Sequence, residues 1–279
     1  MKFTKMQGAG NDYIYVDCFK EKVPNPNETA VKVSDRHFGI GADGLVLIEP
    51  SDVADFKMDM YNSDGSQAKM CGNATRCVAK YVYDNGMTDK TEIALETLSG
   101  IKHIKMFIEN GKVTSARVNM GAPVTDPKKI PVNLDGDIVL GHTIEVGGDE
   151  YAITCISMGN PHCVVFFEDT HAFAVDKIGP LFEHHPLFPD RVNTEFVQPI
   201  DAKTLKMRVW ERGAGETLAC GTGACATVAA AILNGHCKKD EDIRMLLLGG
   251  VLVIRWDSKS GDIYMTGPAE TVCTGEIDL

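Results

Sequence analysis

The sequence has no hydrophobic run long enough to cross a membrane. Its longest apolar stretch, residues 246–254, is interrupted by Gly249 and Gly250, whereas a transmembrane helix needs about 20 apolar residues. The first residues, MKFTKMQGAGNDY, contain no apolar core of the kind found in signal peptides. We therefore expect a cytoplasmic protein with no membrane partner.

Excess positive charge is also absent, since the net formal charge is −11 at pH 7. A surface that follows nucleic-acid phosphates is basic, so no nucleic-acid partner is expected. Gly39-Ile40-Gly41 mimics part of a dinucleotide-binding fingerprint, but the third glycine and a following helix are missing. With 279 residues, 44% of them apolar and 24% charged, the chain is typical of a globular protein with two domains of ordinary size.

The nine cysteines lack the spacing of a disulfide framework or of a zinc site built from paired CxxC units. We therefore expect no metal. Most cysteines of this kind are small buried hydrophobic residues, and this interpretation is assigned to Cys18, Cys155, Cys163, Cys237 and Cys273. Cys71 and Cys220 are exceptions because of the residues that surround them.

Features of the chain recur at an offset of 149 residues. Cys71-Gly72 recurs as Cys220-Gly221, and Gly10-Asn11 as Gly159-Asn160. The alternating strand pattern of residues 56–61 recurs at 205–210, and the Asn-Gly pair at 85–86 recurs at 234–235. The order of these features predicts an internal duplication into two similar half-domains, with the Pro- and Gly-rich residues 121–137 as the linker.

Each Cys-Gly pair is predicted to begin a helix. The segments NATRCVAKYVYDNG and TGACATVAAAILNG follow Cys71 and Cys220, contain no proline and end at Gly86 and Gly235. Turn-rich loops, NSDGSQ and ERGAGE, lie upstream. Each cysteine therefore stands where a loop becomes the N-terminus of a helix.

This placement favours acid–base chemistry. A helix N-terminus is expected to lower the pKa of a thiol from about 8.5, and its free N–H groups bind anions. Inverting a stereocentre by proton transfer needs a base on one face and an acid on the other. We therefore predict that Cys71 and Cys220 are the acid–base pair of an enzyme without a cofactor, and that N–H groups of Gly72, Asn73, Gly221 and Thr222 stabilise a substrate carboxylate.

Seven segments resemble those of the diaminopimelate epimerase family and occur in the same order: GAGNDY (8–13), DRHFGIGADG (35–44), YNSDGS (61–66), CGNATRC (71–77), GNPHCV (159–164), NTEF (193–196) and WERGAGETLACGTGA (210–224). The resemblance implies cofactor-independent interconversion of LL- and meso-2,6-diaminoheptanedioate, on the route to lysine and peptidoglycan. It also implies a homodimer and an α+β fold. That fold has two pseudo-symmetric half-domains, each a barrel-like, mostly antiparallel sheet around a central helix, with the active site in the cleft between them. We place the half-domains at residues 1–118 with 266–279, and at 119–265.

The resemblance further implies roles for individual residues. Cys71 and Cys220 match the two catalytic cysteines. His162 and Glu211 match residues that could tune their protonation, and Glu211 and Arg212 also match a pair that reads the distal ammonium and carboxylate. The full set of implied substrate-binding residues is Asn11, Asn62, Gly72, Asn73, Asn160, Asn193, Glu211, Arg212, Gly221 and Thr222.

Two positions depart from the family pattern. Ala74 stands where many members have glycine, and Gly44 stands where some members have a substrate-contacting glutamine. No side-chain role is therefore expected at position 44.

Two other functions remain open at this point. Proline or hydroxyproline racemases also use two cysteines, but their substrates lack the distal head that Glu211 and Arg212 would bind. The cysteines could instead form a redox switch, in which oxidation joins Cys71 to Cys220, or a metal site in a binding protein.

Overall fold

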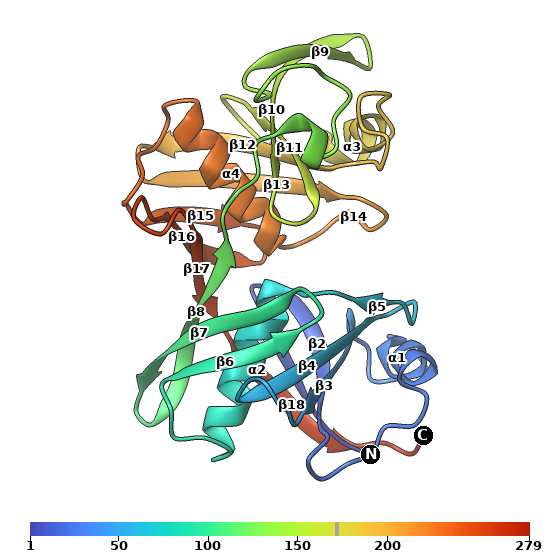
Figure 1. Cartoon of the computed structure of the whole chain (residues 1–279). Coiled ribbons are helices and arrows are strands. Elements are labelled where there is room, and N and C mark those ends of the chain that lie inside the picture. The colour runs from blue at the N-terminus through green and yellow to red at the C-terminus, as the bar shows by residue number, and fades with distance from the viewer. Residues whose placement is uncertain (171–172) are drawn as a thin grey trace. The chain divides into compact units, whose positions relative to one another are not determined.

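The computed structural model describes residues 1–170 and 173–279 and divides into two units. Unit 1 comprises Met1–Asn119 and Thr266–Leu279, and unit 2 comprises Met120–Met265. The chain therefore leaves unit 1 once and returns to it near its end (Figure 1). None of the helices in the described ranges is long and apolar enough to cross a membrane.

Unit 1 contains two helices, α1 and α2, among short strands. Its elements are β1 (Lys2–Gly8), β2 (Asn11–Asp17), α1 (Pro26–Ser34), β3 (Gly44–Glu49), β4 (Phe56–Asn62), β5 (Gln67–Ala68), α2 (Gly72–Asp84), β6 (Glu92–Thr97), β7 (Gly100–Glu109), β8 (Lys112–Gly121) and β18 (Glu270–Glu276).

Unit 2 repeats this pattern with helices α3 and α4. Its elements are the 3-10 turn η1 (Pro127–Lys129), β9 (His142–Val146), β10 (Asp149–Ser157), β11 (Pro161–Phe166), α3 (Val175–Glu183), β12 (Asn193–Asp201), β13 (Thr204–Glu211), β14 (Gly215–Glu216), α4 (Gly221–Leu233), β15 (Ile243–Leu247), β16 (Gly250–Trp256) and β17 (Ile263–Pro268).

Strand pairing is the same in the two units. In unit 1, β1–β2, β3–β4, β4–β5 and β6–β7 are antiparallel, while β2–β3 and β4–β6 are parallel. In unit 2, β10–β11, β12–β13, β13–β14 and β15–β16 are antiparallel, while β11–β12 and β13–β15 are parallel. The predicted α+β fold with a mostly antiparallel sheet is confirmed.

The register preserves the offset of 149 residues. Ile14 is opposite Leu45 in unit 1, and Cys163 is opposite Thr194 in unit 2. Val46 is opposite Met60, and Glu195 is opposite Val209. The offset therefore identifies structurally equivalent positions residue by residue.

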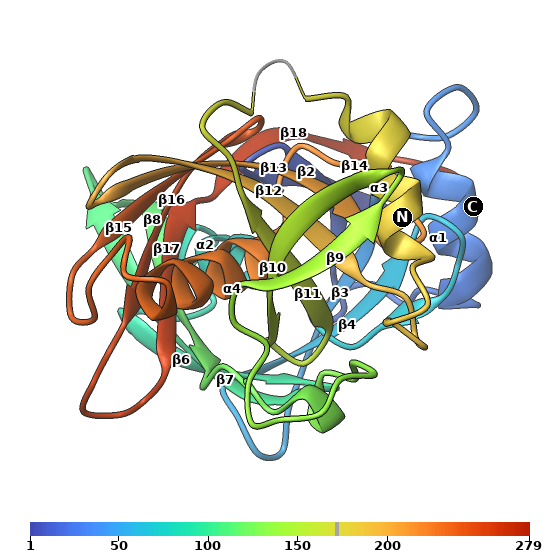
Figure 2. The same ribbon diagram turned by 90° about the horizontal axis from the view of Figure 1, so that it is seen from above.

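One helix of each unit is enclosed by that unit's strands. α2 packs on β1, β2 and β7, and α4 packs on β10, β11, β12 and β16 (Figures 1 and 2). The alanine-rich sequence of α4 lets strands approach it closely, and most of its residues are buried. Both helices end before a glycine with positive φ, Gly86 at 69° and Gly235 at 82°, as the sequence predicts.

Two expectations about the chain are wrong. Residues 121–137 are no linker, because they belong to unit 2 and insert Ile130 and Val132 into its hydrophobic core. Their apolar side chains lie between the polar turn residues, so burial outweighs the loop-like composition. Cys273 is exposed because every residue of β18 is exposed, and Cys18 is only partly buried.

Candidate active site

Each of the two predicted catalytic cysteines immediately precedes a central helix. Cys71 has an extended backbone (φ −134°, ψ 124°) and is followed by α2, and Cys220 (φ −115°, ψ 110°) is followed by α4. A small residue, Gly72 or Gly221, is the first residue of each helix, so its N–H is among those that the helix leaves unbonded. The predicted position of both cysteines at a helix start agrees with the structure.

In unit 1, the sulfur of Cys71 faces an amide oxygen. The Cys71 thiol donates to Oδ1 of Asn11 over 3.3 Å, and Nδ2 of Asn73 donates to the same oxygen over 3.4 Å. Nδ2 of Asn11 is held by Oδ2 of Asp43 at 2.8 Å. Asp43 thereby fixes the amide of Asn11 with its oxygen toward the cysteine.

Asp43 is itself held by several donors. Its Oδ2 accepts from the backbone N–H of Asp12 at 3.2 Å, and its Oδ1 pairs with Arg36 at 3.0 Å. Burial and the nearby charge of Asp12 raise the pKa of Asp43, while hydrogen bonds from Asp12 and Asn11 and the charge of Arg36 oppose that rise. The Asp43 carboxylate is therefore a fixed part of the hydrogen-bond network next to Cys71.

The start of α2 rests on a fully buried arginine. Arg76 donates to Oδ1 of Asn73 at 2.8 Å, to the carbonyl of Gly72 at 3.3 Å and to that of Pro268 at 3.1 Å. Two of these acceptors belong to the predicted carboxylate-binding residues. The Arg76 guanidinium therefore holds the first turn of α2 in place through these hydrogen bonds.

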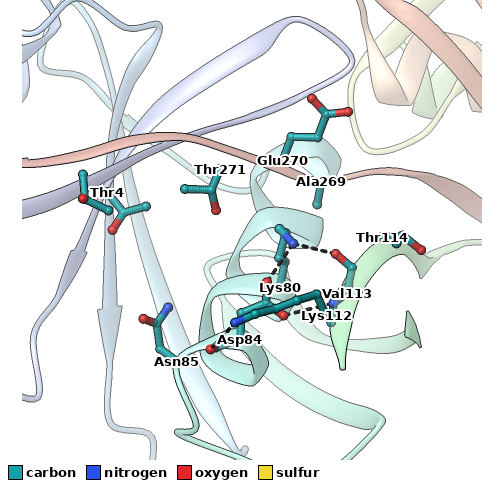
Figure 3. Close-up of a pocket in the computed structure, with 11 residues that line it drawn as sticks. Thr4, Lys80, Asp84, Asn85, Lys112, Val113, Thr114, Ala269, Glu270 and Thr271 are labelled. Carbon is teal, nitrogen blue, oxygen red and sulfur yellow. Dashed lines mark hydrogen bonds and ion pairs between the residues drawn. The ribbon is translucent and has the colours of Figure 1, made fainter. Parts of the chain in front are cut away.

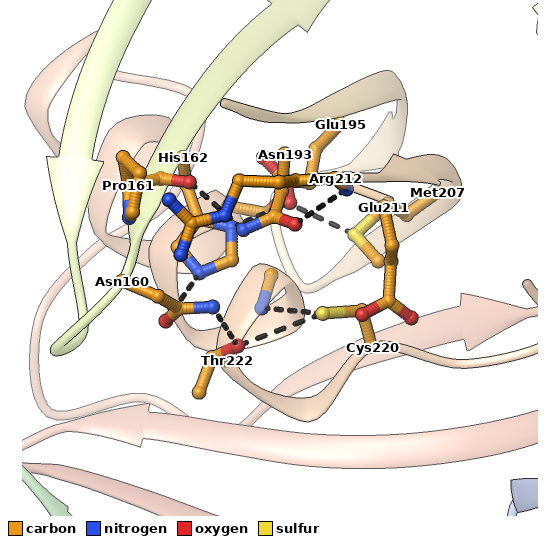
Figure 4. Close-up of polar contacts among 12 residues, drawn as sticks. Asn160, Pro161, His162, Asn193, Glu195, Met207, Glu211, Arg212, Cys220 and Thr222 are labelled. Carbon is orange, nitrogen blue, oxygen red and sulfur yellow. Dashed lines mark hydrogen bonds and ion pairs between the residues drawn. The ribbon is translucent and has the colours of Figure 1, made fainter. Parts of the chain in front are cut away.

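In unit 2, the sulfur of Cys220 has two polar neighbours. The N–H of Gly223 lies 3.4 Å from the sulfur, and the hydroxyl of Thr222 lies 3.5 Å from it (Figure 4). Nδ2 of Asn160 donates to that hydroxyl oxygen over 3.3 Å. The Thr222 hydroxyl accepts from Asn160, and in its contact with Cys220 either the hydroxyl or the thiol can be the donor.

Behind this chain lies a buried histidine–carboxylate pair (Figure 4). Nδ1 of His162 is 2.7 Å from Oε1 of Glu195, and Nε2 is 3.0 Å from Oδ1 of Asn160. Both His162 and Glu195 are 0% exposed. The predicted residues Asn160, His162, Thr222 and Cys220 are thus joined in one network.

The expectation of a lowered thiol pKa is wrong for Cys220. Burial raises its pKa well above the usual value, and the charges of Glu211 and Glu195 raise it further. The hydrogen bonds from Thr222 and Gly223 act in the opposite direction but do not offset desolvation. Before substrate enters, this cysteine is therefore a neutral thiol at pH 7.

The residues expected to read the distal head of the substrate have structural partners as well. Oε1 of Glu211 accepts from the hydroxyl of Thr217 at 2.5 Å, and a guanidinium nitrogen of Arg212 donates to the carbonyl of Asp190 at 2.7 Å. The Arg212 side chain is otherwise exposed.

Two of the predicted asparagines differ in their surroundings. Asn193 is buried, donates to the carbonyl of Pro161 at 2.9 Å and accepts the N–H of Arg212 at 2.9 Å, so its amide ties β11 to the Glu211–Arg212 turn. Asn62 is partly exposed and donates to the hydroxyl of Ser66 at 3.0 Å.

The two departures from the family pattern have physical reasons. A side chain at Gly44 would collide with the carbonyl oxygen of Tyr61, so this position carries none. A Cβ at Gly223 would lie 2.5 Å from Oε1 of Glu195. Ala74 is the equivalent of Gly223, and the equivalent of Glu195 in unit 1 is Val46. A methyl group is tolerated at 74 because unit 1 has no carboxylate at that position.

Four contributors were not predicted from the sequence: Asp43, Arg76, Glu195 and Thr217. Glu195 could have been found as a lone charge within a strand otherwise made of buried residues, Asn193 to Val197. Arg76 could have been found as the only charged residue among the first eight residues of α2, 72–79. Asp43 and Thr217 have no such signal.

A surface pocket of about 630 Å³ in unit 1 is separate from these residues (Figure 3). Its charged side chains have hydrogen-bond partners within the protein: Lys80 pairs with Asp84 at 2.7 Å, Lys112 donates to the carbonyl of Asp84 at 3.1 Å, and Glu270 accepts from Gln7 at 2.8 Å. Within the described ranges, no cluster of three or more His, Cys, Asp or Glu side chains could hold a metal ion.

Comparison with known proteins places this site in a family. The family model of diaminopimelate epimerase matches residues 3–125 and 154–272. The diaminopimelate epimerase of Acetivibrio thermocellus is 58% identical over 279 residues, which cover 100% of this chain and 99% of that protein. The enzyme of the same name from Methanococcus maripaludis (strain C5) is also 58% identical, with 100% of both chains covered.

Solved structures with little sequence identity share the fold. A probable proline racemase from Agrobacterium radiobacter superposes with a TM-score of 0.71 at 15% identity, covering 100% of this chain and 93% of the other. A phenazine biosynthesis protein of the PhzF family from Bacillus anthracis gives 0.69 at 17% identity, covering 100% and 99%. The match of the family model and the full-length identity establish that this chain belongs to the diaminopimelate epimerase family.

Proposed function

We propose that the chain inverts one α-carbon of 2,6-diaminoheptanedioate, interconverting the LL and meso forms, with Cys71 and Cys220 as the proton-transferring groups. The duplicated element carries the proposal: each unit places one cysteine at the extended residue that precedes its central helix. The reaction class is that of the family, an isomerisation that serves lysine biosynthesis.

The proton steps balance without any other reactant. One cysteine, as thiolate, takes the α-proton, and the electron pair of the C–H bond passes toward the neighbouring carboxylate. The other cysteine, as thiol, gives its proton to the opposite face of the same carbon and becomes the thiolate. The two protonation states are therefore exchanged after one turnover, so the pair titrates as a unit.

The first turns of α2 and α4 would stabilise the charge that develops on the substrate carboxylate. The N–H groups of Gly72, Asn73, Gly221 and Thr222 lie at the positive ends of helix dipoles. Loss of one such preorganised donor costs about 3–4 kcal/mol in other enzymes. These four groups therefore account for a sizeable part of the proposed rate enhancement.

We assign the distal amino-acid head to Glu211 and Arg212. One carboxylate for an ammonium and one guanidinium for a carboxylate match its two charges. The bond from Thr217 to Oε1 leaves the second oxygen of Glu211 as the acceptor for the ammonium. Asn11, Asn62, Asn160 and Asn193 complete the proposed set of substrate-binding residues.

The assay that tests this function compares two substrates. Purified protein is incubated with LL-diaminopimelate and, separately, with L-proline in ²H₂O, and product stereochemistry and α-deuterium are measured. We expect turnover of diaminopimelate only. Turnover of proline alone would contradict the proposal, and loss of activity on exhaustive chelation would support a metal site instead.

We further propose that units 1 and 2 act as the two half-domains, residues 1–118 with 266–279 and residues 119–265, and that the enzyme is a cytoplasmic homodimer without a nucleic-acid partner. Light scattering after size exclusion should give twice the chain mass of 30.3 kDa. A mass of one chain in active fractions would contradict the dimer.

A further inference from the structure

Glu195 is buried, charged and outside the groups that the mechanism uses. Its Oε1 lies 2.7 Å from Nδ1 of His162, and its Oε2 has no hydrogen-bond partner in the part of the chain that the structure describes. Its surroundings are crowded on the side of α4, where a Cβ at Gly223 would lie 2.5 Å from Oε1. A buried carboxyl group with one oxygen left without a hydrogen bond is costly, and this cost points to a function for Glu195.

The atoms around His162 fix where its protons are. Nε2 faces the amide oxygen of Asn160 at 3.0 Å, and an amide oxygen only accepts, so Nε2 carries a hydrogen. The Nδ1–Oε1 link then also holds one proton, either on the imidazole beside a carboxylate or on Glu195 beside a neutral imidazole. In both forms the pair has no net charge, which suits two side chains that are 0% exposed.

The alternative form is unfavourable. A neutral imidazole protonated at Nδ1 beside an ionised Glu195 would leave a net negative charge in a buried space that Glu211 already makes negative. It would also point the lone pair of Nε2 at the oxygen of Asn160. The amide of Asn160 would then turn over, and the hydroxyl of Thr222 would donate to Asn160 rather than to Cys220.

We propose that Glu195 is a positioning residue that acts through His162 and Asn160 to direct the hydroxyl hydrogen of Thr222 toward the sulfur of Cys220. The chain runs from Nε2 of His162 to Oδ1 of Asn160, from Nδ2 of Asn160 to the Thr222 oxygen at 3.3 Å, and from that hydroxyl to the sulfur at 3.5 Å. It gives Cys220 a second donor beside the N–H of Gly223.

Unit 1 supports this interpretation by contrast. There Asp43 binds Nδ2 of Asn11, the equivalent of Asn160, and turns the amide oxygen toward the thiol of Cys71. In both units a carboxyl group fixes the orientation of the asparagine amide, Asp43 directly and Glu195 through His162. The two orientations are opposite: the amide oxygen of Asn11 faces Cys71, whereas the amide nitrogen of Asn160 faces Thr222, next to Cys220. The donor chain therefore opposes the burial that raises the pKa of Cys220, whereas the acceptor beside Cys71 favours its thiol form, and the inference rests on the proposed two-cysteine reaction.

The decisive comparison is between Glu195→Gln and Glu195→Leu. Both variants remove the ionisable carboxyl group, but only glutamine can still donate to Nδ1 of His162 and keep the hydrogen on Nε2. The ionisable groups that face Glu195 are His162 and Cys163 on β11, Glu211 at the end of β13, and Cys220 before α4. All four are present in both variants, so their contributions cancel in the comparison.

The readout is the pH at which iodoacetamide alkylates Cys220 at half its maximal rate, followed by mass spectrometry. We expect this midpoint to lie about one pH unit higher in Glu195→Leu than in Glu195→Gln, and kcat to be about tenfold lower with KM changed much less. Adding Thr222→Val to both variants should abolish the difference in midpoint. Equal midpoints in the two single variants, or a difference that survives Thr222→Val, would overturn the proposal.

A measurement on the unaltered enzyme covers the case in which Glu195→Leu fails to fold. In protein labelled with ¹⁵N-histidine, with His162→Asn used for assignment, Nε2 of His162 should be protonated at pH 7. A neutral ring protonated at Nδ1 alone would overturn the proposal. Neither this spectrum nor the alkylation requires turnover, so failure of the proposed epimerase activity would be recognised separately, in the assay with LL-diaminopimelate.

Discussion

Replacement of Gly223 by alanine tests how tightly the second half of the site is packed. The added Cβ would lie 2.5 Å from Oε1 of Glu195 and 3.2 Å from the sulfur of Cys220. To reach ordinary contact at 3.4 Å, the carboxylate must retreat by about 0.9 Å. The hydrogen bond to His162 is only 2.7 Å long, so this retreat stretches or breaks it.

The expected energies partly cancel. Overpacking a buried site costs about 1–3 kcal/mol, and exchanging glycine for alanine in a helix returns up to about 1 kcal/mol. We therefore expect a net loss of about 1 kcal/mol and a Tm lower by about 2–4 °C. We expect kcat to fall at least tenfold, because both Glu195 and the sulfur are displaced.

Ala74→Gly is the matched control. It is the equivalent position of α2, it removes about 1 kcal/mol of helix propensity, and no carboxylate stands above it. Urea denaturation and steady-state kinetics of both variants should show similar losses of stability but a loss of kcat only in Gly223→Ala. Wild-type kcat in Gly223→Ala, or an equal loss in both variants, would refute the reasoning.

Two further predictions concern the buried ionisable groups Arg76 and Cys220. Arg76→Met should lower the free energy of unfolding by at least about 3 kcal/mol in urea denaturation, because it removes three charge-assisted hydrogen bonds that support the start of α2. The control Arg191→Met, at an exposed arginine, should change it by less than about 1 kcal/mol. Equal effects of the two substitutions would contradict the structural role of Arg76. Because burial raises the pKa of Cys220, its alkylation in the ligand-free enzyme should be half-maximal above pH 9, against about pH 8.5 in urea. The same shift makes the free energy of unfolding decrease as the pH rises from about 8.5 through the raised pKa, and a folded midpoint at or below the unfolded one would contradict it.

The sequence predicted the elements whose local signals are strong. The two Cys-Gly helix starts, the Asn-Gly helix ends and the alternating strands β4 and β13 were read correctly, because each depends on a few neighbouring residues. The duplication was visible for the same reason. Its full extent, the matching order of parallel and antiparallel pairs, depends on contacts between distant segments and needed the structure.

What the sequence could not provide was the environment of each polar group. The pKa of Cys220 was expected to be low from its helix alone, but burial and two carboxylates from other strands raise it. The Pro- and Gly-rich composition of residues 121–137 predicts a linker, but the apolar side chains between the turn residues are buried in the core of unit 2. The importance of Glu195 depends on His162, 33 positions away in the chain.

The most direct test of the two-cysteine mechanism is hydrogen exchange in Cys71→Ser and Cys220→Ser. Each variant is incubated in ²H₂O with LL-diaminopimelate and, separately, with the meso isomer, and α-deuterium incorporation is followed by mass spectrometry. Serine is a poor base, so each variant should exchange the α-proton of mainly one isomer, opposite in the two variants, with epimerisation nearly lost. Full epimerisation by both variants, with no dependence on the isomer supplied, would contradict the account.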